Sequence, residues 1–236
     1  MTRYLPVALV ALVCGFLGAW LFALSGFGAS STEAYLLGHP EILPKMAERL
    51  QRDEAARRVA AAGGEVARPF PGAVLGNPRG SKTLVEFTDY GCTYCRQSIA
   101  DVQALIAADP DLRVVVREWP IFEGSDAAAR MALAAARQGK YAEFHDLMFA
   151  HGPPSPATIE LAAKGAGLDL PAARAFAGSP EAELELRANH EMAAKLGFEG
   201  TPSWVAGQSA FSGAVGRDRL AEAIAAAADA KGDGGA

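Results

Sequence analysis

The feature that most constrains this chain is a pair of cysteines, Cys92 and Cys95, placed directly after an apolar run. The run Thr83–Phe87 is typical of a buried strand, and a short turn separates it from the first cysteine. A helical pattern follows the pair and extends through Ala107. A strand, a turn and a C-x-x-C motif that opens a helix form the arrangement that a dithiol redox site needs.

The chemistry of the pair follows from its place at the start of a helix. The first N–H groups of a helix have no partner within it, and together with the helix dipole they stabilise negative charge. A cysteine there loses its proton more easily, and the thiolate is the nucleophile. We therefore interpret Cys92 as the nucleophile and Cys95 as the resolving thiol, with Arg96 adding positive charge nearby.

Two other uses of the motif have less support in the sequence. A structural zinc site takes four ligands, whereas the only other cysteine, Cys14, lies in an apolar stretch. The histidines show no close pairing; they are His39, His145, His151 and His190. A purely structural disulfide across so short a loop would constrain the unfolded chain little. We therefore predict no metal and no other cofactor.

Several further motifs occur in a specific order along the chain. They are Val85-Glu86-Phe87 before the cysteines, Arg117-Glu118-Trp119-Pro120, the Ala127–Ala136 helix, Tyr141 to Phe149, and Gly200-Thr201-Pro202-Ser203. With this set, Pro71 to about Ala228 resembles the thioredoxin-fold disulfide oxidoreductases of the DsbA type. The resemblance implies an α/β, thioredoxin-like fold with a helical insertion domain over about 122–195.

The resemblance also implies roles for residues outside the dithiol. Glu86 lies in an otherwise apolar segment, and buried acids are rare without a partner or a function. The matching family position is a glutamate beneath the dithiol, so Glu86 is a candidate proton relay for Cys95. The alternative is a glutamate on an edge strand that pairs with Lys82.

The Thr201-Pro202 dipeptide brings the chain back to the sheet, and proline is allowed at the first residue of a strand. By resemblance, Pro202 follows a cis peptide bond and faces the dithiol. The exposed backbone of Thr201 would then pair with a substrate strand beside the mixed disulfide. Both residues are candidate substrate-binding residues.

The remaining pattern supports an alternating α/β core. Leu112–Trp119 is typical of a second strand, which the helix after Cys95 connects to the first in a parallel unit. Ser125 is predicted to cap an alanine-rich helix. Residues 154–197 continue helical, which is far more than a crossover needs, and Arg217–Ala228 forms a closing helix.

The N-terminal residues 1–29 form an apolar segment. The apolar run 4–27 is long enough to span a bilayer, with Arg3 on the cytoplasmic side. We expect an uncleaved signal anchor that tethers the protein to the inner membrane. Ala23-Leu24-Ser25 is also compatible with a cleavage site, which would leave a soluble periplasmic protein. Either way we expect export to the periplasmic side of a bacterial inner membrane, where disulfides persist.

Residues 30–70 form a separate helical extension and linker. Ile42, Leu43, Met46 and Leu50 recur at three- and four-residue spacing among many charges, and Gly63-Gly64 ends the pattern. Such an apolar stripe must pack on something. We interpret 40–62 as a possible homo-oligomer contact; the alternatives are packing on its own domain or on the membrane surface.

The domain organisation predicted is therefore 1–29, 30–70, a DsbA-like domain over 71–230, and a loose tail over 231–236. Half of the 236 residues are hydrophobic, enough for one sizeable core, and the net charge of −5 argues against nucleic acid as the main partner. We predict a thiol–disulfide oxidoreductase whose partners are unfolded or partly folded exported proteins and a redox partner protein.

The direction of electron flow stays open at this point. Thr93-Tyr94 stands between the cysteines in place of the proline-histidine pair of the strongest oxidants in the family, which favours a milder oxidant. Isomerase or reductase activity is therefore an alternative. A non-catalytic chaperone-like module and a protein that handles Cu(I) or zinc through its dithiol are further alternatives.

Overall fold

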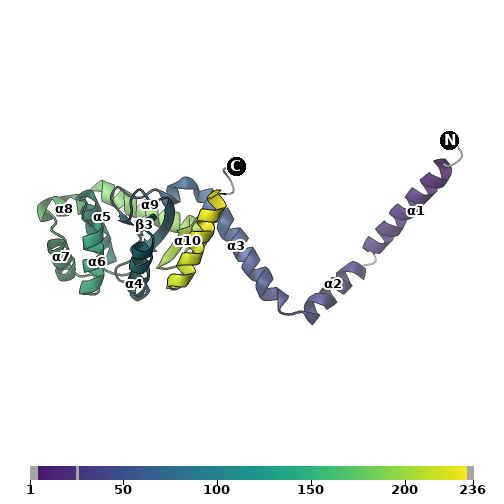
Figure 1. Ribbon diagram of the computed structural model, residues 1–236, viewed down its shortest axis with the longest axis horizontal. Coiled ribbons are helices and arrows are strands. Elements are labelled where there is room, and N and C mark those ends of the chain that lie inside the picture. The colour runs from purple at the N-terminus through teal and green to yellow at the C-terminus, as the bar shows by residue number, and fades with distance from the viewer. Residues whose placement is uncertain (1–4, 25–26, 233–236) are drawn as a thin grey trace. The chain divides into compact units, whose positions relative to one another are not determined.

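The computed structural model describes residues 5–24 and 27–232, and it divides into two compact units, Met1–Gln51 and Arg52–Ala236. The first unit contains α1 (Leu5–Leu24), α2 (Phe27–Gly38) and the beginning of α3 (Ile42–Ala62) (Figure 1). Arg3, the alternative cleavage position after Ser25 and residues 233–236 of the predicted tail lie outside the described residues.

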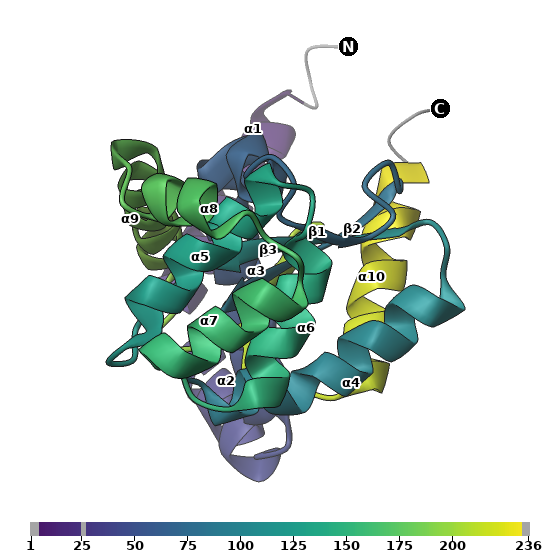
Figure 2. The same cartoon turned by 90° about the vertical axis from the view of Figure 1, so that its left-hand side faces the viewer.

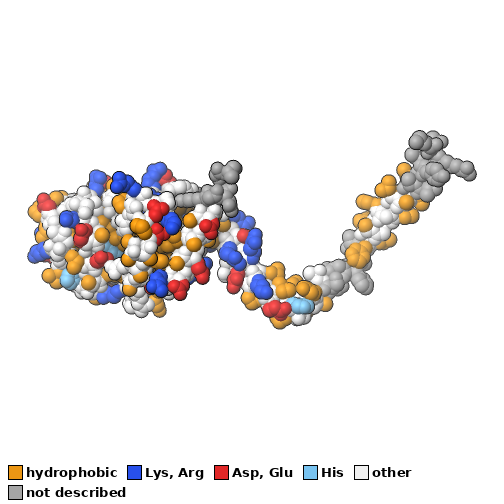
Figure 3. Space-filling model, in the orientation of Figure 1, with side chains coloured by type: hydrophobic (Ala, Val, Ile, Leu, Met, Phe, Trp, Pro, Cys, Tyr) orange, Lys and Arg blue, Asp and Glu red, His pale blue; other side chains and the backbone are white. Residues whose placement is uncertain are grey.

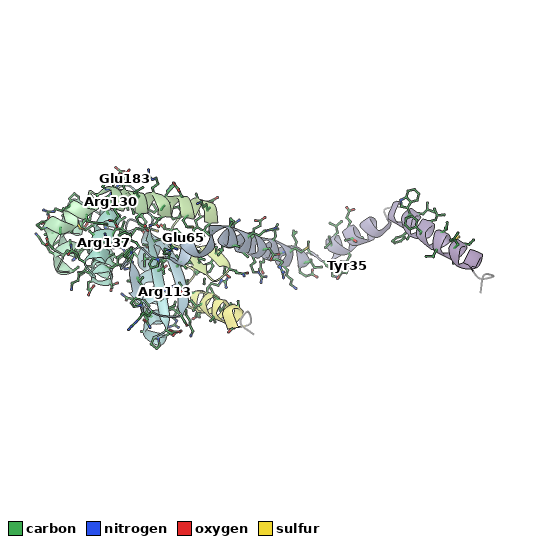
Figure 4. The ribbon with its side chains drawn as sticks, turned by 90° about the horizontal axis from the view of Figure 1, so that it is seen from above. Tyr35, Glu65, Arg113, Arg130, Arg137 and Glu183 are labelled. Atoms are coloured by element: carbon green, nitrogen blue, oxygen red, sulfur yellow. The ribbon has the colours of Figure 1, made fainter. Side chains whose placement is uncertain are left out.

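The first unit exposes an unusual amount of apolar surface. Figure 3 shows apolar side chains gathered along α1 and around the junction of α2 and α3. On α3 the exposed apolar residues are Leu43, Met46 and Leu50. Tyr35, labelled in Figure 4, stacks on His39 one turn later in the chain. Over residues 5–24 and 27–232, no helix meets the combined length and apolarity required to cross a membrane.

The second unit alternates strands and helices. Its elements after α3 are the 3-10 segment η2 (Gly63–Ala67), β1 (Val74–Gly76), β2 (Lys82–Thr88), α4 (Thr93–Ala108), β3 (Leu112–Glu118), α5 (Ser125–Arg137), α6 (Tyr141–His151), α7 (Pro156–Gly165), α8 (Leu170–Ala177), α9 (Pro180–Leu196), β4 (Ser203–Ala206), β5 (Ser209–Ser212) and α10 (Arg217–Gly232). Both predicted core strands and the helix that follows the cysteines are therefore present.

The five strands form one mixed sheet in the order β1-β3-β2-β4-β5. β2 and β3 pair in parallel, as the sequence predicts, and the other three pairings are antiparallel. β2 is the central strand. Glu86 therefore has β3 on one side, through Val116, and β4 on the other, through Trp204. The alternative that Glu86 lies on an edge strand is wrong.

The two faces of the central strand belong to different cores, because successive side chains of a strand point to opposite faces. Leu84 packs in a large cluster with residues of α4, α10 and the helices α5–α8. Val85 and Phe87 pack in a smaller cluster with Trp119, Phe198 and residues of α3, η2 and α9. Glu86 and Thr88 alternate with these and share the face of Leu84, which is the face that carries the dithiol helix.

The end of α3 is part of the smaller core. Val59 and, after the helix, Val66 are buried there. The Arg58 Nε atom donates a hydrogen bond of 2.9 Å to the carbonyl of Leu196, the last residue of α9. A cation at the C-terminus of a helix satisfies a free carbonyl and stabilises the helix dipole. The extension is thus divided: residues from Arg52 onward pack in the second unit.

A buried arginine fixes the segment after α3. The guanidinium of Arg117 donates to the backbone carbonyls of Glu65, Val66 and Arg68, and to the Asn189 side chain on α9. Figure 4 labels Glu65 at the end of α3, where η2 follows. Because several backbone groups share one guanidinium, the linker is held against the sheet by hydrogen bonds rather than by apolar contacts alone.

The five helices α5–α9 lie between β3 and β4 in the chain, the place where the sequence predicts an insertion. In Figure 2, α5, α6, α7 and α8 group together, while α4 and α10 lie next to each other against the sheet. One local prediction is wrong: Ser125 does not cap α5. Gly124 is the N-cap, with a φ of 81° that favours glycine, and Ser125 is the first helical residue.

Candidate active site

Cys92 is the N-cap residue of α4. Its extended backbone precedes the helix, and its sulfur accepts the backbone N–H of Cys95 at 3.5 Å. An N-cap side chain normally satisfies an unpaired N–H of the first turn. A thiolate at this position would receive the same N–H and the positive end of the helix dipole. Cys92 thus lies at the start of the helix, as the sequence predicts, and its role as the nucleophile stays a prediction.

Cys95 lies in the first turn of α4 and is fully buried, whereas Cys92 is 3% exposed. Both are free thiols, and the N–H contact between them places the two residues on the same turn. Burial raises the pKa of the Cys95 thiol, and the carboxyl of Glu86 raises it further. The Cys95 thiol therefore holds its proton until a nearby base takes it.

Glu86 lies beneath the dithiol with no exposed surface. Burial raises its pKa to about 7, and the Thr88 hydroxyl, two residues along the same face, opposes part of this rise. Neither carboxyl oxygen makes a hydrogen bond within the described residues, and Lys82 pairs instead with Asp109 at 2.7 Å. An acid with this pKa can exchange a proton near neutral pH.

The predicted substrate-binding pair lies opposite Cys92. The Cys92 thiol donates a hydrogen bond of 3.2 Å to the backbone carbonyl of Thr201. The Thr201–Pro202 peptide bond is cis, as the resemblance implied. The hydroxyl of Thr201 also opposes part of the rise in the pKa of Cys95. All five predicted site residues, namely Glu86, Cys92, Cys95, Thr201 and Pro202, thus come together at the end of the central strand.

Asp89 organises the turn and was not among the predicted site residues. Its carboxylate accepts three backbone N–H groups, from Gly91 at 2.7 Å, Ile121 at 2.6 Å and Phe122 at 2.9 Å. These bonds tie the turn before Cys92 to the loop after β3. A side chain at Gly91 would collide with Ser125 and Phe122, so the approach of the two loops also needs that glycine. The signal available in the sequence was an Asp two residues before a Gly, which is typical of an Asx turn.

Glu118 is the second site residue that sequence reasoning missed. It is completely buried at the end of β3, where the hydroxyls of Tyr90 and Tyr141 donate to one of its oxygens at 2.9 and 2.6 Å. Burial raises its pKa to about 8 against the effect of both hydroxyls, and the charges of Asp89 and Glu86 add to the rise. The sequence signal was an acid at the end of an apolar strand, parallel to the strand of Glu86.

Comparison with known proteins places this geometry in a family. The model of the DSBA-like thioredoxin domain matches residues 83–225, more than half of the chain. The chain therefore belongs to the family of DSBA-like thioredoxin domains, and its fold is thioredoxin-like. This confirms the predicted resemblance and the prediction of a DsbA-like oxidoreductase.

Two solved structures show the extent of the likeness. A thioredoxin-like oxidoreductase from Silicibacter pomeroyi DSS-3 is 43% identical, with a TM-score of 0.63 over 66% of this chain and 91% of that one. A linker-deletion mutant of Proteus mirabilis ScsC shares the fold at 23% identity, with a TM-score of 0.68 over 84% of this chain and 92% of that one.

Among curated proteins, the chain is 29% identical over 149 residues to the Na(+)/H(+) antiporter NhaA 1 of Salinispora arenicola (strain CNS-205). The match covers 61% of this chain and 23% of the antiporter. The chain thus spans about a quarter of the length of the curated relatives that it matches first.

The raised pKa of Glu86 predicts a pH-dependent stability. Between pH 4.5 and about 7 the folded state keeps a proton that the unfolded state loses, so the free energy of unfolding falls as the pH rises. Glu86→Gln stays uncharged and should remove up to about 3 kcal/mol of this fall. Chemical denaturation of both proteins at about pH 5 and about pH 8 measures it.

The matched control is Glu183→Gln, which changes an exposed glutamate of α9 and should leave the pH dependence as it is. Equal pH dependence in the Glu86→Gln variant and the unchanged protein would show that the carboxyl of Glu86 titrates normally in the folded state.

Proposed function

We propose that this protein is an exported thiol–disulfide oxidoreductase that exchanges disulfides with protein substrates through Cys92 and Cys95. The observation that carries the proposal is the asymmetry of the pair. The Cys92 sulfur sits at the helix N-terminus beside the Thr201 carbonyl, while Cys95 is buried over Glu86. One sulfur is placed to meet substrate and the other to resolve the adduct.

The oxidising reaction begins with the Cys92–Cys95 disulfide. A substrate thiolate attacks the Cys92 sulfur, the bond between the two cysteines breaks, and Cys95 leaves as a thiolate that takes a proton from Glu86. A second substrate thiolate then attacks the substrate sulfur of the mixed disulfide and releases Cys92 as a thiolate. The substrate is oxidised by two electrons, and a redox partner protein restores the disulfide.

The surface around the dithiol suits an unfolded polypeptide. Three large apolar side chains are exposed there: Tyr94 between the cysteines, and Ile121 and Phe122 on the loop held by Asp89. The carbonyl of Thr201, 3.2 Å from the Cys92 sulfur, is available to the backbone of a peptide attached to that sulfur. The position of the Thr201 carbonyl supports Thr201 and Pro202 as the substrate-binding pair. The exposed apolar side chains support exported, partly folded proteins as substrates.

The cysteine roles predict opposite outcomes for two variants. Cys92→Ser should abolish dithiol oxidation, whereas Cys95→Ala should accumulate substrates as mixed disulfides at Cys92, because the resolving thiol is absent. Non-reducing electrophoresis and mass spectrometry of the adducts measure both. Cys14→Ser is the matched control, since this third cysteine lies on α1, and it should keep full activity. Adducts that form without Cys92 but not without Cys95 would reverse the assignment.

We propose export through residues 4–27, retained as an inner-membrane anchor. The 20 residues of α1 include no charged side chain, and Arg3 precedes them in the sequence. The protein should fractionate with the inner membrane and resist extraction by salt. Mass spectrometry of the N-terminus decides between the two forms: a mature chain that begins at Gly26 would overturn the anchor and leave a soluble periplasmic enzyme.

A second candidate function, disulfide isomerisation by an oligomer, is favoured by one observation. Leu43, Met46 and Leu50 are exposed along one stripe of α3, at 71, 54 and 55%. A stripe of this kind stabilises a helix only when it is covered. Isomerisation requires repeated contact with one misfolded substrate, and several active sites held together raise the effective concentration of thiols.

This candidate predicts an oligomer that depends on the stripe. The protein starting at Ser30 should be oligomeric at about tens of micromolar by light scattering. Replacement of Leu43, Met46 and Leu50 by Gln should yield a monomer that keeps dithiol oxidation and loses isomerase activity. Leu161→Gln with Leu184→Gln is the matched control, because both leucines are equally exposed in the second unit. A monomeric protein before any substitution would favour the simple oxidase.

A further inference from the structure

A second buried acid lies on the same face of the sheet as Glu86. In the parallel pair of β2 and β3, Glu86 is opposite Val116 and Thr88 is opposite Glu118. Residues two apart on one strand share a face, so both carboxyls point to the dithiol side. They are diagonal neighbours across adjacent strands, and each has no exposed surface. The charge of Glu86 acts on Glu118 directly.

The groups around the two carboxyls come from four elements and their loops. Tyr90 and Tyr141 donate to Glu118, and Asp89 follows β2 with its carboxylate bound by backbone N–H groups. On α6, His145 contacts Tyr90 edge-on and Tyr141 at a tilted angle, and on α4 the facing group is Cys95. Thr88 completes the set on β2.

The two acids have no lysine or arginine partner in the described residues, by hydrogen bond or by ion pair. Arg117 is next to Glu118 in sequence, but its side chain lies on the opposite face of the sheet. There its guanidinium donates to backbone carbonyls and to Asn189. One oxygen of Glu118 and both oxygens of Glu86 have no hydrogen-bond partner within the part of the chain that the structure describes. Two carboxylates close together in a dry core, without a cation, do not both ionise readily.

We propose that Glu86 and Glu118 share one proton as a coupled acid pair, and that Glu118 is a positioning residue that acts through Glu86 to set the pH at which Cys95 releases its proton. The inference rests on the proposed thiol–disulfide exchange at the same site. Because the two buried carboxyls lie on one face of adjacent strands and the charge of Glu86 raises the pKa of Glu118, proton loss belongs to the pair rather than to either residue.

The step that depends on the pair is release of a substrate from its mixed disulfide with Cys92. The Cys95 thiol gives its proton to the Glu86 carboxylate, and the resulting thiolate attacks the Cys92 sulfur. The Cys92–Cys95 bond forms, the bond from Cys92 to the substrate breaks, and the substrate leaves as a thiolate that takes a proton from water. The ionised fraction of Glu86 therefore determines the rate at low pH, and a charge on Glu118 reduces that fraction.

Rapid-mixing kinetics test the pair. A mixed disulfide between Cys92 and an aromatic chromophoric thiol releases the coloured thiolate as Cys95 attacks, between about pH 5 and about pH 9. In the unchanged protein the release rate should rise over a broad range, because the pair loses its protons in two steps. Glu118→Gln should give one narrow step with a lower midpoint, because Glu86 then ionises beside a neutral group at every pH. Release in the upper part of the range should be faster by up to about tenfold, whereas release at the lowest pH should be unchanged, because Glu118 is already protonated there.

A second variant keeps Glu118 and changes only its hydrogen bonding. Tyr141→Phe removes the donor at 2.6 Å that stabilises the Glu118 carboxylate. Glu118 then holds its proton to higher pH, so the second step should move to higher pH while the first step, loss of the proton of Glu86, should stay where it is. Glu143→Gln, an exposed glutamate on the same helix, is the matched control and should reproduce the unchanged profile.

The outcomes separate this inference from the proposed function. If the unchanged protein neither forms nor releases the adduct at Cys92, the proposed exchange itself fails. If release occurs but the midpoint and breadth of its pH profile are the same in the Glu118→Gln and Tyr141→Phe variants, the pair is not coupled and Glu118 is purely structural. If Glu118→Gln unfolds, the Tyr141→Phe profile alone decides between these two outcomes.

Discussion

The removal of water from Cys95 and Glu86 is the constraint on which the rest of this site depends. A thiol and a carboxyl that are both buried have raised pKa values, and the charge of Glu86 makes Cys95 still harder to ionise. Cys92 is also largely buried, at 3% exposed, but it caps a helix, where the backbone N–H of Cys95 meets its sulfur. The fold thus separates two cysteines of one turn into two chemical environments.

This separation arises because the two faces of the sheet carry different kinds of residue. The face of Leu84 carries the acids, the tyrosines and the dithiol helix, while the face of Val85 and Phe87 is apolar and is closed by α3, η2 and α9. On that second face, Arg58 and Arg117 bind carbonyls rather than substrate. The packed face behind the central strand supports Glu86 under the cysteines, as the proposed proton relay requires.

The sequence predicted the parts of the site that have local signals. A C-x-x-C motif after an apolar strand, a helix with a capping residue and a Thr-Pro at a strand start can each be recognised within a few residues. Glu118 and Tyr141 could not be connected in this way, because their contact depends on how α6 packs against β3. The prediction that Ser125 caps α5 was wrong for a local reason. The N-cap is Gly124, whose left-handed conformation favours glycine over a residue such as serine.

Buried acids without cations oppose folding, so their presence needs compensation elsewhere. Part of it is visible around the pair: two tyrosine hydroxyls bind Glu118, and three backbone N–H groups bind the neighbouring carboxylate of Asp89. Glu86 has less support, because in the described residues only the Thr88 hydroxyl opposes the effect of burial on its pKa. A carboxylate that accepted several hydrogen bonds would be a stable anion with a low pKa and a poor proton donor. Burial of Glu86 with little compensation is therefore what brings its pKa to about 7, the range that the proposed proton exchange with Cys95 requires.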